Sequence, residues 1–456
     1  MGKLPEEFKD MVAGLAAAEP RVAGLTEALE ESEPAVSVRI NPGKSAPAIA
    51  DGAEAVGWWS GGHYLERRPA FTLDVAMHQG RYYVQDASSM FIAHIISQLT
   101  RGMGPLAYLD ACASPGGKTT AAIDALPEGS LVVANEFDYR RAEILRENVT
   151  KWGYPGVVVS RGDTVRFRKL AGTFDIIAAD VPCSGEGMMR KDEAAVAQWS
   201  RGLIAECAAR QREIVDNLWG ALKPGGYLIY STCTFNRDEN EAIVEYLIDR
   251  YGAESVALDG VTEAFPEILP AIGSEIAAFR FMPHRTRGEG LFMAVVRKLG
   301  DLREGAPSER KKSGKGGVKS QVKLPQWWPA GLDPIVNGDA LYGVEPRWRD
   351  LYEQLIRRLD VIMPGVEVAV IKGRDLIPAQ GVAMLRGDRI PPEVERVEVD
   401  EPTALTYLRR EAITLRESAG RGYLLLTHQG SPLGWVKNLG NRSNNLYPPA
   451  WRIRHL

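Results

Sequence analysis

The sequence is poor in cysteine, contains no long apolar run and has no excess of basic residues. Its four cysteines form no C-x-x-C pair, which argues against a zinc site or a thioredoxin-like motif, so we predict no bound metal. Because no run of about 18 apolar residues occurs, we expect no membrane-spanning segment. The first residues lack the pattern of a signal peptide, and we therefore expect a reducing compartment, the cytoplasm.

The formal net charge of the 456 residues is −4, whereas domains that bind nucleic acids are often basic overall. This balance weighs against a nucleic-acid partner but leaves room for local basic patches, where phosphates bind. The length indicates two or three domains. Changes in pattern along the chain predict an N-terminal domain over 1–95, a central domain over 96–300, a linker over 301–325 and a C-terminal domain over 326–456.

In the central domain, short apolar runs alternate with segments of helical periodicity. The expected strands are Leu106–Asp110, Leu131–Glu136, Val157–Asp163, Phe174–Asp180 and Tyr227–Ser231. Between them we expect helices, one of which ends at Gly153 and a longer one at Pro224–Gly226. Residues 279–282 and 291–297 are predicted to form a closing hairpin. Strands that alternate with helices indicate an α/β fold, a Rossmann-like, doubly wound parallel sheet.

The flanking regions differ in character from the central domain. Residues 4–16 have the spacing of an amphipathic helix, and 36–40 have the pattern of a strand. The Gly-rich, aromatic stretch 57–90 predicts loops and turns that lead into a helix near Asp86–Gln98. Basic residues among Gly, Ser and Pro over 301–323 indicate a flexible linker. The C-terminal domain mixes predicted strands over 366–371 and 423–427 with a helix near 402–412, which indicates an α+β fold.

The strongest local motif, Asp110-Ala-Cys-Ala-Ser-Pro-Gly-Gly-Lys-Thr119, joins a predicted strand to a predicted helix. Glycines at such a turn let a ligand approach the backbone, and the helix N-terminus presents free N–H groups. A phosphate-binding loop requires G-x-x-x-x-G-K-[ST], and Cys112 occupies the position of its first glycine, so that match fails. A P-loop-like nucleotide hydrolase stays as an alternative, because 174–180 could serve as its metal-holding strand.

Acidic residues end the strands that follow this turn. Glu136 lies about 20–25 residues past the glycines, where a carboxylate can accept hydrogen bonds from ribose hydroxyls. Asp163 ends the third strand, where it could bond an adenine amino group, and Asp180 ends the fourth. For any one acid, a surface turn or a helix cap is an equal explanation. Together they suit a ligand with a ribose, an adenine and a sulfonium cation, which predicts S-adenosylmethionine.

Two cysteines, Cys183 and Cys233, end neighbouring strands at the predicted ligand edge, whereas Cys207 has the pattern of a buried helix residue. C5 of cytosine is a poor nucleophile, and addition of a thiolate to C6 turns the ring into an enamine that reacts at C5. The addition needs a proton or a hydrogen bond at N3, for which Asp180 is the candidate. A second thiol suits the release step. The target base must be single-stranded or flipped out of a duplex.

Taken together, these motifs resemble the Sun-type (Nop/Fmu) family of RNA cytosine-C5 methyltransferases, and most closely its bacterial members that act on 16S ribosomal RNA. The resemblance covers about residues 1–300. Its motifs are Arg39–Asn41, Tyr83–Met90, Cys112–Lys118, Glu136, Asp163, Asp180–Gly185, Arg190–Asp192, Ser231–Thr234, Pro283–His284 and Gly288–Phe292.

The resemblance implies that Cys233 is the covalent nucleophile and that Cys183 aids release of the product, with Asp180 facing the cytosine. It also implies that the cofactor is bound by Cys112, Ala113, Ser114, Pro115, Gly116, Gly117, Lys118, Glu136, Asp163 and Asp180. DNA cytosine methyltransferases use the cysteine of the Pro-Cys motif, so Cys233 within Ser-Thr-Cys favours RNA. The family usually has Ala in place of Ser114, a small difference that we expect the site to tolerate.

The C-terminal region is similar to the PUA-like RNA-binding domains of the 16S enzymes, at Leu433–Lys437 and in the aromatic, basic tail. The resemblance implies an RNA-binding N-terminal extension and small-subunit ribosomal RNA as the partner, and we expect a monomer. Phosphate contacts from Arg442, Arg452 and Arg454 would suit RNA, and so would a base stacked on a tryptophan. A place in the domain core explains the tryptophans equally well.

Several features leave two interpretations open. Arg190 and Lys191 fit either a phosphate contact near the active site or a solvated loop. The basic linker fits either a solvated tether or a weak RNA contact. A non-catalytic RNA-binding assembly factor remains an alternative to an enzyme, and the cysteine pair argues against it because binding alone needs neither thiol.

Overall fold

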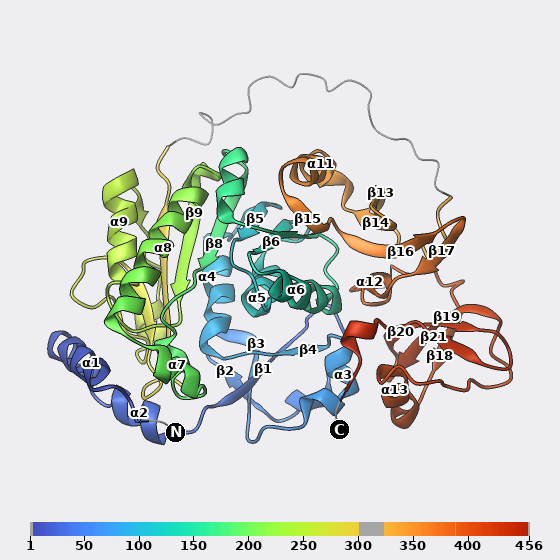
Figure 1. Cartoon of the computed structure of the whole chain (residues 1–456), viewed down its shortest axis with the longest axis horizontal. Coiled ribbons are helices and arrows are strands. Elements are labelled where there is room, and N and C mark those ends of the chain that lie inside the picture. The colour runs from blue at the N-terminus through green and yellow to red at the C-terminus, as the bar shows by residue number, and fades with distance from the viewer. Residues whose placement is uncertain (1–2, 301–322, 388, 455–456) are drawn as a thin grey trace.

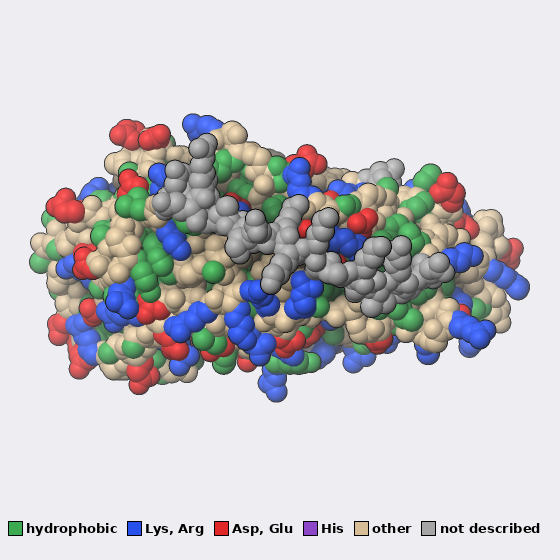
Figure 2. All heavy atoms as spheres, turned by 90° about the horizontal axis from the view of Figure 1, so that it is seen from above, with side chains coloured by type: hydrophobic (Ala, Val, Ile, Leu, Met, Phe, Trp, Pro, Cys, Tyr) green, Lys and Arg blue, Asp and Glu red, His purple; other side chains and the backbone are tan. Residues whose placement is uncertain are grey.

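The computed structural model describes residues 3–300, 323–387 and 389–454 (Figure 1). Most of the predicted linker, 301–325, lies outside the described residues. None of the described helices is both long enough and apolar enough to cross a membrane. Figure 2 shows acidic and basic side chains interspersed over one face of the molecule, in keeping with a net charge of −4.

A doubly wound α/β sheet forms the centre of the molecule, as predicted. Its parallel strands are β5 (Ala107–Asp110), β6 (Leu131–Glu136), β7 (Val157–Arg161), β8 (Phe174–Asp180) and β9 (Leu222–Thr232). Its antiparallel strands are β10 (Glu254–Ser255), β11 (Ala278–Phe281), β12 (Leu291–Arg297) and β15 (Asp360–Met363). The pairing of β11 with β12 confirms the predicted closing hairpin.

The order of the strands in this sheet locates its ligand-binding edge. Along the described residues the order is β10-β12-β9-β8-β5-β6-β7-β15, with β11 off this path beside β12. The chain thus extends the sheet to one side of β5 with β6 and β7, and to the other side with β8 and β9. The carboxyl ends of β5 and β8 therefore border the point of reversal, where open α/β sheets bind ligands.

Helices cover both faces of the sheet, because alternate residues of its buried strands point to opposite sides. Tyr108 and Val132 belong to the core on one face, and Leu109 and Val133 belong to the core on the other. The first face is covered by α4 (Phe91–Leu99), α5 (Gly117–Ala125) and α6 (Tyr139–Trp152). The second is covered by α8 (Arg201–Trp219), α9 (Glu241–Tyr251) and α11 (Arg349–Arg358). Two shorter helices are α7 (Glu193–Gln198) and α10 (Val261–Ala264).

The ends of two helices test the sequence predictions. Helix α6 ends at Gly153, as predicted, and this glycine has a left-handed φ of 79° that caps the helix. The longer helix, α8, ends earlier than expected, at Trp219, and Pro224–Gly226 lies inside β9. The backbone around Gly226 exchanges hydrogen bonds with Lys298 instead. The prediction was wrong because proline and glycine are unfavourable inside a helix wherever they occur. They therefore did not show that the helix had already ended and that the next strand had begun.

The N-terminal part combines two helices with a small antiparallel sheet. Its elements are α1 (Glu6–Ala18), α2 (Leu25–Glu31), β1 (Val36–Ile40), β2 (Glu54–Val56), β3 (Trp59–Leu65), α3 (Val75–His78) and β4 (Tyr82–Val84), and its strand order is β2-β3-β1-β4. The first helix and β1 confirm the predictions, but the expectation of loops and turns over 57–90 is wrong where β3, α3 and β4 form. In β3, Gly61 and Gly62 occupy positions where a Cβ would crowd Trp59 or Met90, and these glycines hide the strand pattern.

The C-terminal part contains two small sheets that share a core with Leu341, Leu425 and Trp435. The first has β13 (Asp333–Asn337), β14 (Ala340–Val344), β16 (Val366–Lys372) and β17 (Asp375–Pro378); the second has β18 (Arg396–Glu398), β19 (Gly422–His428), β20 (Ser431–Asn438) and β21 (Ser443–Asn445). Two helices, α12 (Gln380–Ala383) and α13 (Glu401–Leu408), accompany them. The predicted strands and helix are confirmed.

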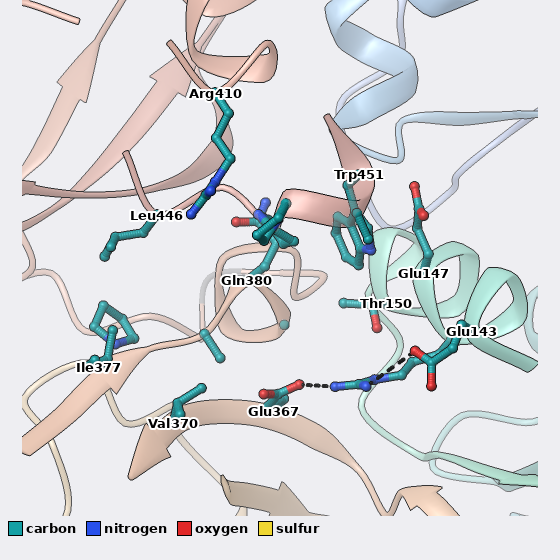
Figure 3. Close-up of a pocket in the computed structure, with 17 residues that line it drawn as sticks. Glu143, Glu147, Thr150, Glu367, Val370, Ile377, Gln380, Arg410, Leu446 and Trp451 are labelled. Atoms are coloured by element: carbon teal, nitrogen blue, oxygen red, sulfur yellow. Dashed lines mark hydrogen bonds and ion pairs between the residues drawn. The ribbon is translucent and has the colours of Figure 1, made fainter. Parts of the chain in front are cut away.

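This C-terminal part packs directly against the central sheet. Strand β15, which lies between the two strands β14 and β16 in the sequence, pairs antiparallel with β7 at the edge of the central sheet. A cavity of about 360 Å³ lies between α6 on one side and β16, β17 and the end of the chain on the other (Figure 3).

Candidate active site

The glycine-rich turn follows β5 and leads into α5. Gly116 has a φ of 108°, a left-handed conformation that only glycine adopts readily, and α5 begins at Gly117. Asp110, at the end of β5, is buried and accepts a hydrogen bond from the Thr119 hydroxyl (2.6 Å). Burial raises the pKa of Asp110 to about 7, although this hydrogen bond opposes the shift. The turn is thus tied to the strand by a polar contact within the motif itself.

Lys118, in the first turn of α5, points toward the neighbouring strand end. Its ammonium group lies 2.9 Å from a carboxylate oxygen of Asp180, the last residue of β8. Burial opposes the charge on Lys118, but the attraction and hydrogen bond from Asp180 outweigh it and raise the pKa of Lys118. In a phosphate-binding loop this lysine would reach for the ligand phosphates. Its engagement with a carboxylate argues against the nucleotide-hydrolase alternative.

Glu136 and Asp163 lie at or just after the ends of two adjacent strands, β6 and β7. Glu136 is buried, accepts a hydrogen bond from the backbone N–H of Asp138 (2.9 Å) and lies 3.7 Å from the Arg141 guanidinium. Asp163 is exposed, and its Oδ1 caps a short 3-10 turn through the N–H of Val165 (2.8 Å). The structure therefore places both acids along the predicted edge, one buried and one facing solvent.

The two predicted catalytic cysteines meet although they are 50 positions apart in the sequence. The Sγ atoms of Cys183 and Cys233 are 3.3 Å apart, and both thiols are free and only partly buried. Asp180 pairs in the sheet with Ser231, whose hydroxyl donates to the second Asp180 oxygen (2.7 Å). The loops that follow β8 and β9 thus bring two thiols and one carboxylate to the same edge.

The surroundings of the two thiols separate their acidities. The hydrogen bond from the Cys183 thiol is the main cause that lowers the pKa of Cys233, and the nearby Lys118 ammonium lowers it further against the effects of burial and Asp180. The same hydrogen bond is the largest cause that raises the pKa of Cys183 well above its usual value, and burial is the second largest. Cys233 is therefore the more acidic of the two thiols.

The remaining cysteines have different environments. Cys112 follows Asp110 in the turn, and burial together with the charges of Asp110 and Asp180 raises the pKa of its thiol. Cys207 lies on α8, and burial, together with the charge of Glu239, raises its pKa to about 11. Cys233 is thus the one cysteine of the four whose pKa is lowered by its surroundings.

Two buried glutamates that the sequence analysis missed connect the cysteine loops. The Glu186 carboxylate accepts the backbone N–H groups of Phe235 (2.6 Å) and Asn236 (2.9 Å), the Asn236 side-chain amide and the Trp199 indole N–H. The Glu239 carboxylate accepts the N–H and hydroxyl of Ser184 and the side-chain amides of Gln211 and Asn236. Each glutamate follows one cysteine and bonds the loop of the other.

A second buried pair supports the loop after Cys233. Arg280 forms an ion pair with Glu241, and its guanidinium also donates to the backbone carbonyl of Phe235 (2.7 Å). The one sequence signal for these supporting residues is the polar run from Asn236 to Glu241, directly after the Ser-Thr-Cys motif. Such a run also occurs in ordinary surface loops, so it does not by itself reveal a buried network.

Arg190 matches neither of the two interpretations given to it. Its side chain is only 3% exposed, and it bonds the Glu289 carboxylate and the carbonyl of Gly288 (3.0 Å). Lys191, which is more exposed, bonds the other oxygen of the same carboxylate (2.7 Å). Arg190 therefore has a structural role, because its guanidinium is committed to the segment that packs beside Gly187 and the Cys233 carbonyl.

Comparisons with protein families match three separate parts of the chain. A model described as 16S rRNA methyltransferase RsmB/F matches residues 105–297. A model for the N-terminal domain of 16S rRNA methyltransferase RsmF matches residues 4–87, and a model for the methyltransferase RsmF PUA domain matches residues 394–453. The central match contains the glycine-rich turn, the acids and both cysteines.

Individual relatives and solved structures agree with these matches. The ribosomal RNA small subunit methyltransferase F of Aeromonas salmonicida is 31% identical over 414 residues, which cover 87% of this chain and 84% of the relative. The protein of the same name from Escherichia coli is 30% identical, over 86% and 83% of the two chains. Two crystal structures from Pyrococcus horikoshii, of a methyltransferase homologue and of NSun6 with SFG, share the fold. Their TM-scores are 0.52 and 0.53, and their sequence identities are 24% and 19%. Each alignment covers 64% of this chain, and it covers 99% of the first structure and 98% of the second.

Proposed function

The chain belongs to the RsmF family of 16S rRNA methyltransferases, and from that membership we propose that it transfers a methyl group from S-adenosylmethionine to C5 of a cytosine in small-subunit ribosomal RNA. The observation that carries the proposal is the 3.3 Å contact between the Sγ atoms of Cys183 and Cys233, beside Asp180 and Lys118. A binding protein needs no such pair of thiols, whereas covalent activation of a pyrimidine uses both.

The residues at the carboxyl edge of the sheet fit S-adenosylmethionine as the cofactor. Glu136 and Asp163 offer carboxylate oxygens at adjacent strand ends, which suit the hydroxyl and amino donors of an adenosine. Cys112–Lys118, whose turn depends on the left-handed conformation of Gly116, would hold the remainder together with Asp180. When bound, the cofactor supplies an electrophilic methyl group next to the thiols.

In the first step, the Cys233 thiolate adds to C6 of the cytosine. A bond between Sγ and C6 forms, and the electron pair of the C5=C6 double bond becomes available at C5 for the methyl group. N3 gains a proton from the Lys118–Asp180 pair, in which Asp180 faces the base. The lowered pKa of Cys233 supports this role, because a larger fraction of its thiol is ionised near neutral pH.

In the second step, C5 carries both the methyl group and its original proton, and that proton must leave. Cys183 first passes its own proton to the Lys118–Asp180 pair, which had given its proton to N3, and the resulting thiolate removes the C5 proton. The electron pair of the C–H bond re-forms the C5=C6 double bond, the Sγ–C6 bond breaks to return Cys233 as a thiolate, and N3 releases its proton to solvent. The main cause that raises the pKa of Cys183 is its hydrogen bond to Cys233, so this cause disappears once the Cys233 sulfur is bonded to carbon.

The N-terminal and C-terminal parts of the chain would bind the RNA. The protein would act as a monomer in the cytoplasm, where ribosomal subunits assemble. Arg442, Arg452 and Arg454 are exposed near the end of the chain and could contact phosphates. Trp435 is 1% exposed and donates its indole N–H to the Ala379 carbonyl (3.1 Å), so it belongs to the domain core rather than to a stacking surface. Among these residues, the exposed arginines are therefore the ones that we propose to contact RNA.

The test of the proposal replaces each cysteine by alanine. We expect Cys233→Ala to bind the cofactor but to lose methyl transfer by roughly three orders of magnitude or more, as for removal of other enzyme nucleophiles. We expect Cys183→Ala to accumulate a covalent RNA–protein adduct that resists denaturation, because addition proceeds and release does not. Methyl transfer to small-subunit RNA and denaturing gels measure these two outcomes.

The matched control is Cys207→Ala, which removes a partly buried thiol on α8 outside the site and should leave turnover unchanged. Turnover that persists in Cys233→Ala would refute the covalent mechanism. Binding of ATP with Mg²⁺ in place of S-adenosylmethionine would favour a nucleotide hydrolase, and RNA binding without any transfer would favour an assembly factor. Bisulfite mapping of ribosomal RNA with and without the gene would identify the cytosine.

A further inference from the structure

We propose that Arg386, which follows α12 in the C-terminal part, is a positioning residue for the cofactor turn and acts on it through Asp124 and Arg39. The inference rests on the proposed function, since it takes the turn between β5 and α5 as part of the cofactor site. It adds that the contact of the C-terminal part with the buried Asp124 carboxylate sets the affinity of that turn for S-adenosylmethionine.

Asp124, in the last turn of α5, is the centre of this arrangement. Its side chain is 1% exposed, and one carboxylate oxygen, Oδ1, lies 2.5 Å from the Arg386 guanidinium and accepts the Trp152 indole N–H (3.0 Å). The other oxygen, Oδ2, bonds the Arg39 guanidinium. A single buried carboxylate thus joins arginines from the N-terminal and C-terminal parts of the chain.

Arg39 continues the connection to the cofactor turn. This fully buried residue of β1 donates to the Thr120 hydroxyl (2.5 Å) and reaches the carbonyl of Gly117 (3.5 Å). The Thr120 hydroxyl in turn donates to the carbonyl of Gly116 (2.8 Å), the glycine with the left-handed conformation. From Arg386 to Gly116, every link is a hydrogen bond between buried or partly buried groups.

Several contacts fix the backbone and the side chain of Arg386. Its Nε donates to the Trp152 carbonyl (3.1 Å), and its backbone N–H donates to the carbonyl of Gly153 at the end of α6 (3.0 Å). Its guanidinium also lies over the Trp152 ring, as does that of Arg39, at 5.2 and 4.3 Å from the ring centroid. A Cβ at Gly43 would lie 2.4 Å from the Arg386 side chain, so the N-terminal part closes over it.

The charges explain why loss of Arg386 should reach the turn. Two guanidinium groups share one carboxylate, and each draws the Asp124 side chain toward itself. Without Arg386, Oδ1 of Asp124 keeps only its bond to the Trp152 indole, so Arg39 alone faces the charge of the carboxylate and is drawn away from Thr120 and Gly117. The amide groups of the turn would lose the fixed positions that favour ligand binding, because preorganisation lowers the cost of binding.

The test is Arg386→Gln in the full-length protein, with Arg146→Gln as the matched control. Arg146 belongs to the same contact between α6 and the C-terminal part, where it pairs with Glu367 (2.7 Å) and Glu143 (3.5 Å; dashed lines in Figure 3), and among the described residues no hydrogen bond or ion pair joins either partner to α5. Calorimetry measures the Kd for S-adenosylmethionine, and steady-state kinetics measures kcat and KM for it. We expect Arg386→Gln to raise Kd and KM by roughly threefold to tenfold with kcat little changed, and Arg146→Gln to alter neither.

Hydrogen exchange gives a readout that does not depend on activity. In the protein without cofactor, the amides of residues 116–120 should exchange faster in Arg386→Gln than in the wild type or Arg146→Gln, and Arg386→Lys should restore part of the protection. Equal Kd values for Arg386→Gln and the wild type, or equal weakening by both glutamine variants, would overturn the inference while leaving the proposed function intact. Failure of the wild type to bind S-adenosylmethionine would overturn both.

Discussion

At the scale of single residues, the proposed chemistry depends on an asymmetry between two neighbouring thiols. Cys183 and Cys233 share one hydrogen bond, and the Lys118 ammonium stabilises negative charge on Cys233. The pKa of Cys233 is therefore lowered and that of Cys183 is raised, so Cys233 is the more readily ionised of the two thiols. The ion pair of Lys118 and Asp180 completes the site, because it places a proton source next to the Cys233 sulfur. The two opposite charges of the pair stay close together.

The pH dependence of Cys233 reactivity follows from this hydrogen bond. The thiolate fraction of Cys233 rises as the pH rises through its pKa, which lies below the usual cysteine value in the wild type. In Cys183→Ala the donor is gone, so the pKa of Cys233 should increase and alkylation by iodoacetamide should begin at a higher pH. Mass spectrometry of the peptide with Cys233 gives the rate at each pH. An unchanged profile would contradict the assignment of the thiolate.

At the scale of elements, two loops must remain in register for the thiols to meet. The loops after β8 and β9 are joined by Glu186 and Glu239, and each carboxylate accepts four hydrogen bonds, two per oxygen, from donors that include the opposite loop. Buried carboxylates that are fully bonded favour a single loop conformation. These glutamates are positioning residues, because they do not touch the reacting atoms.

Replacement of Glu186 tests this role. Glutamine has nearly the same shape but offers one acceptor oxygen and an NH₂ group, which would face two N–H donors. We expect Glu186→Gln to lower the unfolding free energy by about 1.5–3 kcal/mol, the typical effect of a hydrogen bond to a charged group, and to reduce kcat more than the KM for either substrate. Denaturant unfolding and steady-state kinetics measure these effects. Glu206→Gln, on the exposed face of α8, should change neither quantity.

At the scale of the whole molecule, the C-terminal part is built into the central fold. Strand β15 extends the central sheet beside β7, and Tyr352 and Leu355 of α11 belong to the same hydrophobic core as β5 and β8. The strand also covers an edge that would otherwise present unpaired backbone groups. A chain with this arrangement should not unfold in independent parts.

Calorimetry tests this integration directly. We expect one unfolding transition for the whole chain, and we expect Tyr352→Ala to lower its midpoint by several degrees, because loss of a buried aromatic ring costs about 3–5 kcal/mol. Val336→Ala, at a largely exposed position of β13, serves as the control. Two transitions, of which Tyr352→Ala shifts only one, would show that the C-terminal part unfolds separately.

The sequence by itself determined the central sheet, the glycine-rich turn and the placement of Asp110, Glu136 and Asp180 at strand ends. These features follow from apolar runs, from helix and turn residues and from the rule that ligands bind at the carboxyl ends of parallel strands, all of which are local or topological. The family resemblance added the roles of the two cysteines, and the site residues stay predictions until the variants are measured.

Only the tertiary structure decided how distant segments meet. The 3.3 Å contact of the thiols, the bonds of Glu186 and Glu239 across the loops, and the connection from Arg386 to the turn join residues that are far apart in the sequence. Periodicity reports which face of an element is buried, but not which partner buries it. For the same reason, β15 gave no sign in the sequence that it belongs to the central sheet, because a strand's partner depends on the folding of the entire chain.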